Sequence, residues 1–197
     1  YFDVRLTSDL SWNNHIEAIT ADSSRTLGLI RRNLKSAPPF VRKLALDTYV
    51  RPKLEYASTI WNPHQLYLIT TLEAVQNRAA RFISSTCDFS FSVSALKTQL
   101  TMSSSQLRRK VSQLRLNHKI YYHIPDLKTT LLLPPDRTSS RLNNVCTIKC
   151  IFGSTNAFNR SFIPQAISDW NSLPSSIVTI LDSADFSSAV KLHLSCH

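Results

Sequence analysis

The scarcity of glycine limits what this chain can fold into more than any other feature of its sequence. Only Gly28 and Gly153 occur among 197 residues. Phosphate-binding loops, dinucleotide-binding turns and β-sandwiches with tight hairpins all need glycine, because their backbones adopt positive φ or approach a ligand closely. The sequence therefore argues against these architectures and favours helices joined by proline-containing and polar turns.

Apolar residues recur at helical spacing through most of the first 120 residues, most densely between residues 44 and 83. We expect a first helix that begins after an N-cap at Ser11 and ends before Pro38. A second helix should begin at Pro39 and be interrupted at Pro52, since a proline ring clashes with the preceding turn. Further helices are expected over residues 66–84, 93–99 and 105–122.

The inner face of each helix follows from residues spaced three or four apart. In the first helix these are Trp12, Ile16, Ile19, Ser23, Leu27, Ile30 and Leu34, and in the second they are Val41, Leu44, Ala45 and Thr48. The helix at 66–84 should bury Leu68, Leu72, Val75, Ala79 and Phe82, and the helix at 105–122 should bury Leu107, Val111, Leu114, His118 and Tyr121. Trp12, Trp61 and Trp170 lie on such apolar stripes, so we expect them to anchor cores.

The fold class expected from these patterns is mainly α. Alternating polar and apolar residues predict short strands over residues 1–7 and 145–152, and two further helices are expected over residues 164–171 and 183–194. Residues 1–124 should form a basic bundle of about four helices with an N-terminal strand. Residues 125–144 are expected to be a linker, and residues 145–197 a smaller mixed subdomain.

Positive charge is concentrated in the first part of the chain. The chain holds 23 Lys and Arg against 13 Asp and Glu, which gives a net charge of +10. Residues 1–120 contain 17 basic and 8 acidic side chains, whereas residues 121–197 contain 6 and 5. A one-sided positive field favours a polyanionic partner such as RNA or DNA, and the alternative is an ordinary solvated basic surface.

No catalytic motif accompanies this charge. No two acidic residues are adjacent, whereas a two-metal polymerase site needs closely placed carboxylates. The histidines at 15, 64, 118 and 123 are scattered along the chain, so we interpret them as surface or packing residues. Zinc ligands could come from Cys146, Cys150, His193, Cys196 and His197. We expect Cys146 and Cys150 instead to be buried thiols on one face of the strand at 145–152.

The sequence gives no sign of secretion or of a membrane span. Its four cysteines form no C-x-x-C pair, and neither a signal peptide nor an apolar run near about 18 residues occurs. We therefore expect an intracellular protein, nuclear or cytoplasmic, with no membrane partner. The chain opens on Tyr1 and its only methionine is Met102, so we expect a fragment of a longer protein.

Five motifs resemble, in order, those of non-LTR (LINE-type) retrotransposon reverse transcriptases of the jockey-like kind. Residues 1–12 (YFDVRLTSDLSW) are similar to the Y-L-G-V…L-S-W segment that follows the catalytic palm, with Phe2 and Asp3 in place of leucine and glycine. Residues 25–34 (RTLGLIRRNL) are similar to the R-x-L-G-x-L-x-R-N-L helix. The most specific matches are residues 50–63 (VRPKLEYASTIWNP) and 72–83 (LEAVQNRAARFI). Residues 161–174 resemble the S-F-F-P…I-x-D-W-N-S-L-P signature.

The resemblance implies the thumb and C-terminal region of an RNA-directed DNA polymerase. The expected partners are an RNA template and DNA primer duplex together with the palm and fingers of the parent enzyme. Any Mg²⁺ would belong to that palm, so no cofactor, no metal and no catalytic residue is assigned to this chain. Phosphate contacts are expected from basic side chains on the helices: Arg31, Arg32, Lys35, Arg42, Lys43, Arg51, Lys53, Arg78, Arg81, Arg108, Arg109 and Lys110.

Two alternatives stay open at this point. A helical protein-interaction module would use the edge of residues 1–7 and the apolar seam of residues 68–82. A non-functional remnant of a transposable element would have no selected partner.

Overall fold

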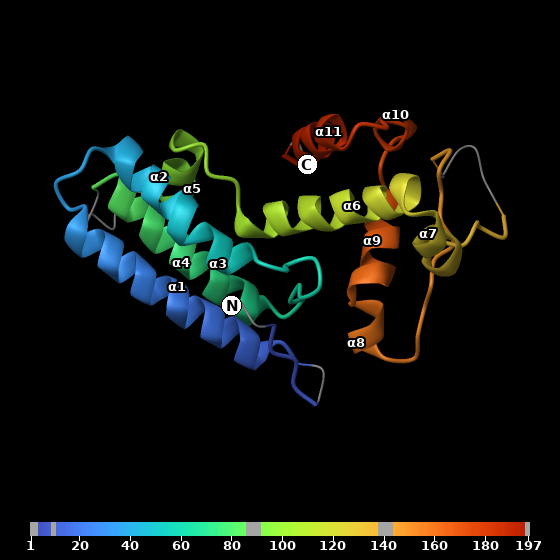
Figure 1. Cartoon of the computed structure of the whole chain (residues 1–197), viewed down its shortest axis with the longest axis horizontal. Coiled ribbons are helices and arrows are strands. Elements are labelled where there is room, and N and C mark those ends of the chain that lie inside the picture. Colours follow the sequence, from blue (N-terminus) through green and yellow to red (C-terminus); the bar gives the residue numbers. More distant parts are fainter. Residues whose placement is uncertain (1–3, 9–10, 86–91, 138–143, 196–197) are drawn as a thin grey trace. The chain divides into compact units, whose positions relative to one another are not determined.

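The computed structural model describes residues 4–8, 11–85, 92–137 and 144–195, and these residues are mainly helical (Figure 1). The expected mainly α fold class is thus confirmed. The described helices are α1 (Asn13–Asn33), α2 (Pro39–Tyr49), α3 (Arg51–Glu55), α4 (Leu66–Ile83), α5 (Val93–Gln99), α6 (Ser105–His123), α7 (Pro125–Leu131), α8 (Asn156–Asn159), α9 (Phe162–Asn171), α10 (Ser175–Val178) and α11 (Ser183–Ser195).

The chain divides into two compact units. Unit 1 comprises Tyr1–Ala57 and Pro63–Gln106, and unit 2 comprises Ser58–Asn62 and Leu107–His197. The sequence-based division placed the boundary at residue 124. It lies earlier in the structure because Leu114 and Ile120 of α6 share one core with Trp170 of α9.

Helices α1 and α4 form the centre of unit 1 and run in the same direction (Figure 1). Tyr67 Oη donates to Asn13 Oδ1 at 2.5 Å near their starts, and Arg78 Nη2 donates to Ser24 Oγ at 3.1 Å farther along. Helices α2, α3 and α5 pack around this pair. The predicted inner faces are confirmed at most positions, since the buried apolar residues include Ile16, Leu27, Ile30, Leu68, Leu72, Val75 and Ala79.

The inner face of α2 differs from the prediction. Arg42 and Leu46 are its buried residues, whereas Leu44, expected inside, is 64% exposed. The helix takes this rotation because the side chain of Arg42 enters the space where α1 and α4 end. The predicted interruption at Pro52 is confirmed, because α2 ends at Tyr49 and α3 begins at Arg51.

Several helix ends in unit 1 are built without glycine. The N-cap position of α1 is Trp12 rather than Ser11, although Ser11 Oγ accepts the N–H of Asn13 at 3.2 Å. Ala57, Ser85 and Thr101 follow α3, α4 and α5 and adopt φ values of 52°, 54° and 52°. Glycine usually occupies such left-handed positions, because a Cβ there costs roughly 1–2 kcal/mol.

A carboxylate from α4 caps the start of α6. Glu73 Oε1 accepts both the N–H and the hydroxyl of Ser105 at 2.7 Å, while Glu73 Oε2 pairs with Lys97 Nζ at 2.7 Å. Burial raises the pKa of Glu73, but the bonds from Lys97 and Ser105 outweigh it, so the pKa lies below its usual value. The negative charge also suits the partial positive charge at a helix N-terminus.

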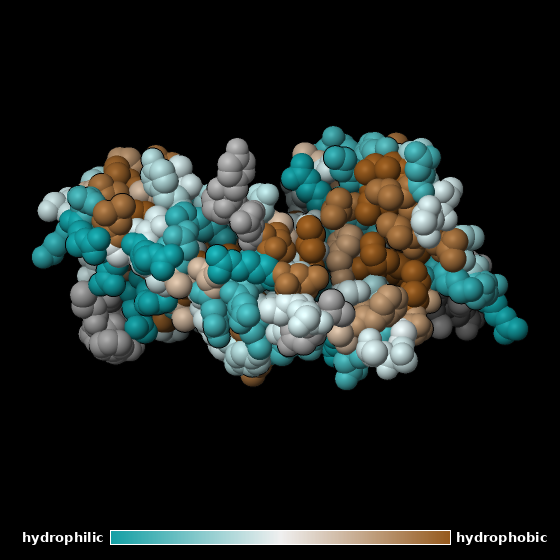
Figure 2. Space-filling model, turned by 60° about the horizontal axis from the view of Figure 1, so that its bottom comes forward, coloured by the Kyte–Doolittle hydropathy of each residue, from teal (hydrophilic) through white to brown (hydrophobic). Residues whose placement is uncertain are grey.

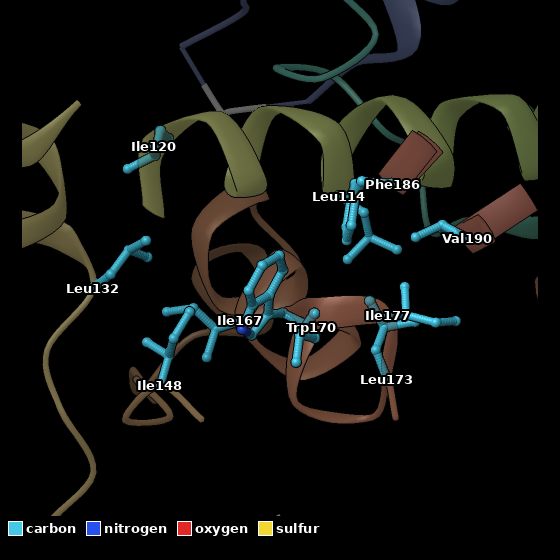
Figure 3. Packing of buried hydrophobic residues seen from close by; sticks show 11 residues of the cluster. Leu114, Ile120, Leu132, Ile148, Ile167, Trp170, Leu173, Ile177, Phe186 and Val190 are labelled. Atoms are coloured by element: carbon cyan, nitrogen blue, oxygen red, sulfur yellow. The ribbon is translucent and has the colours of Figure 1, made fainter. Parts of the chain in front are cut away.

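The core of unit 2 is organised around Trp170. Its indole is fully buried, and Nε1 donates to the carbonyl of Cys146 at 2.9 Å. Figure 3 shows apolar side chains from α6, α9, α10 and α11 gathered around this ring. The cluster consists of Leu114, Ile120, Leu132, Ile148, Ile167, Trp170, Leu173, Ile177, Val178, Phe186 and Val190. The predictions that Trp61 and Trp170 anchor cores are confirmed, since both are fully buried.

The segment expected as a strand at 145–152 is extended, but the described residues pair it with no other strand. Asn171 takes the place of a strand partner: its Oδ1 accepts the N–H of Ile148 at 2.9 Å and its Nδ2 donates to the carbonyl of Ile148 at 2.7 Å. Asn144 Nδ2 donates to the carbonyls of Trp170 and Leu173. Side-chain amides thus satisfy backbone groups that a ladder would otherwise satisfy.

Other parts of the expected organisation also change. Residues 125–144 are not wholly a linker, because α7 occupies Pro125–Leu131. Of the strand expected at 1–7, residues 1–3 lie outside the described residues and residues 4–7 are not a strand. Cys146 is half-buried and Cys150 is exposed, so the expectation of two buried thiols is wrong for Cys150.

His118 of α6 is a fully buried member of the unit 2 interior. Its ring stacks on Phe186 with 4.3 Å between ring centroids, and its Nε2 lies 2.7 Å from the carbonyl oxygen of Ile180. Because a carbonyl only accepts, Nε2 carries the proton, and Nδ1 is buried with no partner among the described residues. Burial lowers the pKa of His118, and the nearby His123 lowers it further, against opposing effects of the Ile180 carbonyl and Asp182.

This burial predicts that unit 2 loses stability in mild acid. The pKa of His118 is lower in the folded chain than the ordinary 6.5, so the unfolded chain binds the proton first. The free energy of unfolding of unit 2 should be constant above about pH 7 and should decrease as the pH drops below 6.5. Urea unfolding of a Trp12→Phe variant, in which fluorescence reports only Trp61 and Trp170 of unit 2, measures the effect at each pH.

The matched variant is His118→Gln, which keeps a donor for the Ile180 carbonyl but cannot be protonated. It should be less stable at pH 7 and should show a flatter pH dependence between pH 5 and 7. An unchanged slope in this variant would assign the acid sensitivity to other groups.

Candidate nucleic-acid interface

Three exposed basic residues lie at the C-terminal end of α1, two in its last turn and the third just after its C-cap residue Leu34. Arg31, Arg32 and Lys35 are all exposed, and no hydrogen bond or ion pair joins their side chains to any other described residue. We call these three residues the α1 basic end. Their charge suits the negative end of the helix dipole, and their exposure leaves them able to contact an anion.

Arg42 has a different role from the one predicted. Its buried guanidinium donates from Nε to the carbonyl of Leu34 at 3.2 Å, from Nη2 to that of Lys35 at 2.6 Å and from Nη1 to that of Phe82 at 2.9 Å. Nη1 also donates to the hydroxyl of Ser85. One side chain thereby donates to carbonyl groups at the C-terminal ends of both α1 and α4. The last carbonyls of a helix have no N–H partners within the helix itself. It is not a surface phosphate contact.

The five further candidates in unit 1 are engaged with neighbouring groups or half-buried. Lys43 Nζ donates to the carbonyl of Leu100 at 2.7 Å, and Lys53 Nζ pairs with Asp22 at 2.7 Å. Arg51 pairs with Glu55 at 3.1 Å and with Asp47 at 3.9 Å. Arg78 bonds Ser24, as described above, and Arg81 is half-buried. Lys53 lowers the pKa of Asp22, chiefly through their hydrogen bond.

The three candidates in unit 2 do not form one exposed group. Arg109 is 1% exposed, and its Nε donates to Asn62 Oδ1 at 3.1 Å. Lys110 Nζ pairs with Asp169 at 3.0 Å, and Arg108 is half-buried. Arg109 therefore holds the Ser58–Asn62 segment to α6, a packing role that the charge pattern did not reveal.

A shallow groove of about 590 Å³ runs between α1 and α4 on the surface of unit 1. Its lining consists of small and hydroxyl side chains with a charge at each end: Glu17, Thr20, Ala21, Ser24, Thr70, Thr71, Ala74 and Arg78. The hydroxyls of Ser24, Thr70 and Thr71 donate to carbonyls within their own helices. They offer acceptors rather than donors to the groove, so an anion would bind only near Arg78.

The groove-lining face of α1 continues toward the α1 basic end. Positions 17, 21, 24, 28 and 32 are separated by three or four residues and therefore share one side of the helix. A Cβ on Gly28 would meet nothing closer than Arg32 Nη1 at 3.8 Å, which shows open space beside the helix there. Helix α1 thus offers one continuous surface that becomes basic at its C-terminal end.

The described residues show no metal centre and no membrane-spanning segment. They contain no group of three or more His, Cys, Asp and Glu side chains placed to hold an ion, and Cys196 and His197 of the considered zinc set lie outside them. A second hollow, of about 610 Å³, lies in unit 2 beside Cys150, with Lys149 Nζ paired to Asp136 at 2.9 Å on its wall. None of the described helices has the length and apolar character needed to cross a bilayer.

Comparison with known proteins gives no family assignment. No protein-family description, curated protein or solved structure matches the chain. What the chain does must therefore be argued from its own residues.

The role of Arg42 predicts which arginines unit 1 needs to fold. Replacing Arg42 with Met keeps the aliphatic stem but removes every hydrogen bond by which the guanidinium joins the ends of α1 and α4, so the free energy of unfolding should fall by about 3 kcal/mol. Replacing exposed Arg31 with Met should change it by less than about 0.5 kcal/mol. Hydrogen exchange of the α1 and α4 amides measures both, and equal protection in the two variants would contradict the assignment.

Proposed function

We propose that this chain is the thumb and C-terminal region of a retrotransposon RNA-directed DNA polymerase of the non-LTR, jockey-like type. In this proposal it grips the template–primer duplex through phosphate contacts, and the palm and fingers of the parent polymerase supply catalysis and Mg²⁺. The motif resemblance along the chain and the net charge of +10 support it.

The structural observation that supports this proposal best is the α1 basic end. Of the twelve candidate cations, Arg31, Arg32 and Lys35 are the ones that combine exposure with side chains joined to no other described residue. Two arginines and a lysine within five residues can neutralise neighbouring phosphates of one strand. Such contacts position a duplex without reading its sequence, and their strength falls with salt because counterions are released on binding.

A second candidate function is a helical protein-interaction module. Phe40 and Leu44 lie one turn apart on α2 and are 71% and 64% exposed. Apolar residues at this spacing are typical of a helix face that packs against another protein. A thumb that packs against a polymerase palm would use such a face as well. The two candidate functions are therefore distinguished by whether the chain binds nucleic acid.

The proposal predicts a defined change in salt dependence. A variant with Arg31→Gln, Arg32→Gln and Lys35→Gln should bind an RNA–DNA duplex more weakly. Its slope of log affinity against log salt should be smaller by about 2 to 3, because each phosphate contact contributes roughly 0.9. Fluorescence anisotropy with a labelled duplex over a salt series measures both quantities.

The control removes three charges elsewhere, with Arg25→Gln, Lys119→Gln and Lys191→Gln, all exposed and outside the twelve candidates, and should leave the slope near that of the original chain. Equal losses in the two variants would mean that only net charge matters. Binding that is absent or insensitive to salt would favour the interaction module, and nucleotide incorporation by the chain alone would overturn the assignment of catalysis to the palm.

A further inference from the structure

The groove between α1 and α4 carries opposite charges at its two ends. Glu17 and Arg78 are both exposed, and neither side chain is paired with an oppositely charged group of any described residue. Arg78 donates instead to neutral oxygens, the Ser24 hydroxyl and the Ala74 carbonyl. An exposed acid and an exposed base that share one groove without meeting can each attract an opposite charge from another molecule.

The register of the two helices determines how far apart these charges lie. Tyr67 bonds Asn13 and Arg78 bonds Ser24, so each α1 residue lies level with the α4 residue whose number is 54 higher. Glu17 lies seven residues before Ser24, the residue level with Arg78, which is about 10 Å along the helix axes. The two charges of one copy are therefore separated along the groove.

This charge arrangement is complementary to itself. The level midway between Glu17 and Arg78 falls between Ala21 and Ala74, and it is also the midpoint of α4 (Leu66–Ile83). A two-fold axis that crosses the groove at this level, at right angles to the helices, places a second copy antiparallel to the first. Glu17 of each copy then lies at the same end of the groove as Arg78 of the other. An axis parallel to the helices would instead bring like charges together.

The side chains between the two charges are small enough for two helix pairs to approach closely. Ala21, Thr70, Thr71 and Ala74 are exposed, and both threonine hydroxyls already donate to the Tyr67 carbonyl. Ordering such short side chains costs little conformational entropy. Helix α4 has 18 residues, about 27 Å, and forms with α1 a face about 20 Å wide. Two such faces would bury about 1,000 Å² in total, the size of a weak association.

The antiparallel orientation also keeps the most positive parts of two copies apart. Arg31 lies ten residues beyond Ala21, about 15 Å along α1, so the two α1 basic ends would be about 30 Å apart. Charges separated by more than about 10 Å are largely screened at about 0.1 M salt, so repulsion between these ends does not prevent association. The dipoles of α1 and α4, which are parallel within one copy, oppose those of the second copy.

We propose that the α1–α4 groove is an interface between two copies of this chain, related by a two-fold axis and joined by two reciprocal pairs of Glu17 and Arg78. Hydrophobic side chains gather mainly on the visible face of unit 2 (Figure 2), so charge and shape rather than an apolar patch define this surface of unit 1. The inference does not depend on the proposed function, because the groove lies beside the α1 basic end and does not include it.

Sedimentation velocity of the full chain at high micromolar concentration measures the association. Glu17→Arg would bring two positive charges to each end of the paired grooves, and Arg78→Glu would bring two negative ones. Each variant should therefore weaken dimerisation at least about 10-fold. Asp126→Arg and Lys119→Glu, which make the same changes of charge at exposed positions in unit 2, are the matched controls and should dimerise like the original chain.

A mixture of the two groove variants separates an interface from any other effect of charge. In a dimer of one Glu17→Arg copy and one Arg78→Glu copy, each end again holds opposite charges, so the mixture should associate although neither variant does so alone. Circular dichroism of each variant checks that its helices are intact. A mixture that stays monomeric, controls that lose as much affinity as the groove variants, or an original chain that is monomeric throughout would overturn the proposal. Duplex binding by the α1 basic end could persist in all three cases, so the proposed function is tested separately.

Discussion

Two parallel helices that end side by side impose the main physical constraint on unit 1. The last carbonyl groups of α1 and α4 point in the same direction, so the partial negative charges of the two helix ends add. The guanidinium of Arg42 meets both ends, donating to Leu34, Lys35 and Phe82 and lying 5.0 Å over the Phe82 ring. The rotation of α2 and the exposure of its Phe40 and Leu44 follow from the need to bring this one side chain inside.

In unit 2, neutral asparagine side chains rather than an arginine bond backbone groups that have no partner in a helix or sheet. Its extended segment has no neighbouring strand among the described residues, so Asn144, Asn159 and Asn171 satisfy its backbone groups instead. An amide side chain can donate and accept at once, which lets one residue bond both peptide groups of another. The Trp170 indole completes the arrangement by donating to Cys146, and the segment is thereby fixed to the core without a sheet.

Helix positions could largely be predicted from the sequence, whereas side-chain roles could not. The periodicity of α4 and α5 and the proline in the first turn of α3 gave bounds close to those observed, because apolar spacing and proline geometry are local properties. The prediction for the inner face of α2 was wrong because it used apolar residues alone, and a buried arginine such as Arg42 does not appear in that pattern. Arg42 and Arg109 resembled surface cations because partners such as Phe82 and Asn62 lie 40 and 47 residues away in the sequence. Arg31, Arg32 and Lys35 stay in the candidate interface because they are exposed and no acidic side chain among the described residues pairs with them.

The left-handed residues after α3, α4 and α5 have a consequence for how unit 1 opens. Ala57, Ser85 and Thr101 each hold a conformation that a side chain disfavours, and this local cost is released as soon as the adjoining turn unwinds. Fraying should therefore start at these three ends and spread inward, while the paired middles of α1 and α4 stay closed. The turns that follow α3, α4 and α5, built without glycine, are thus expected to be the least stable points of unit 1.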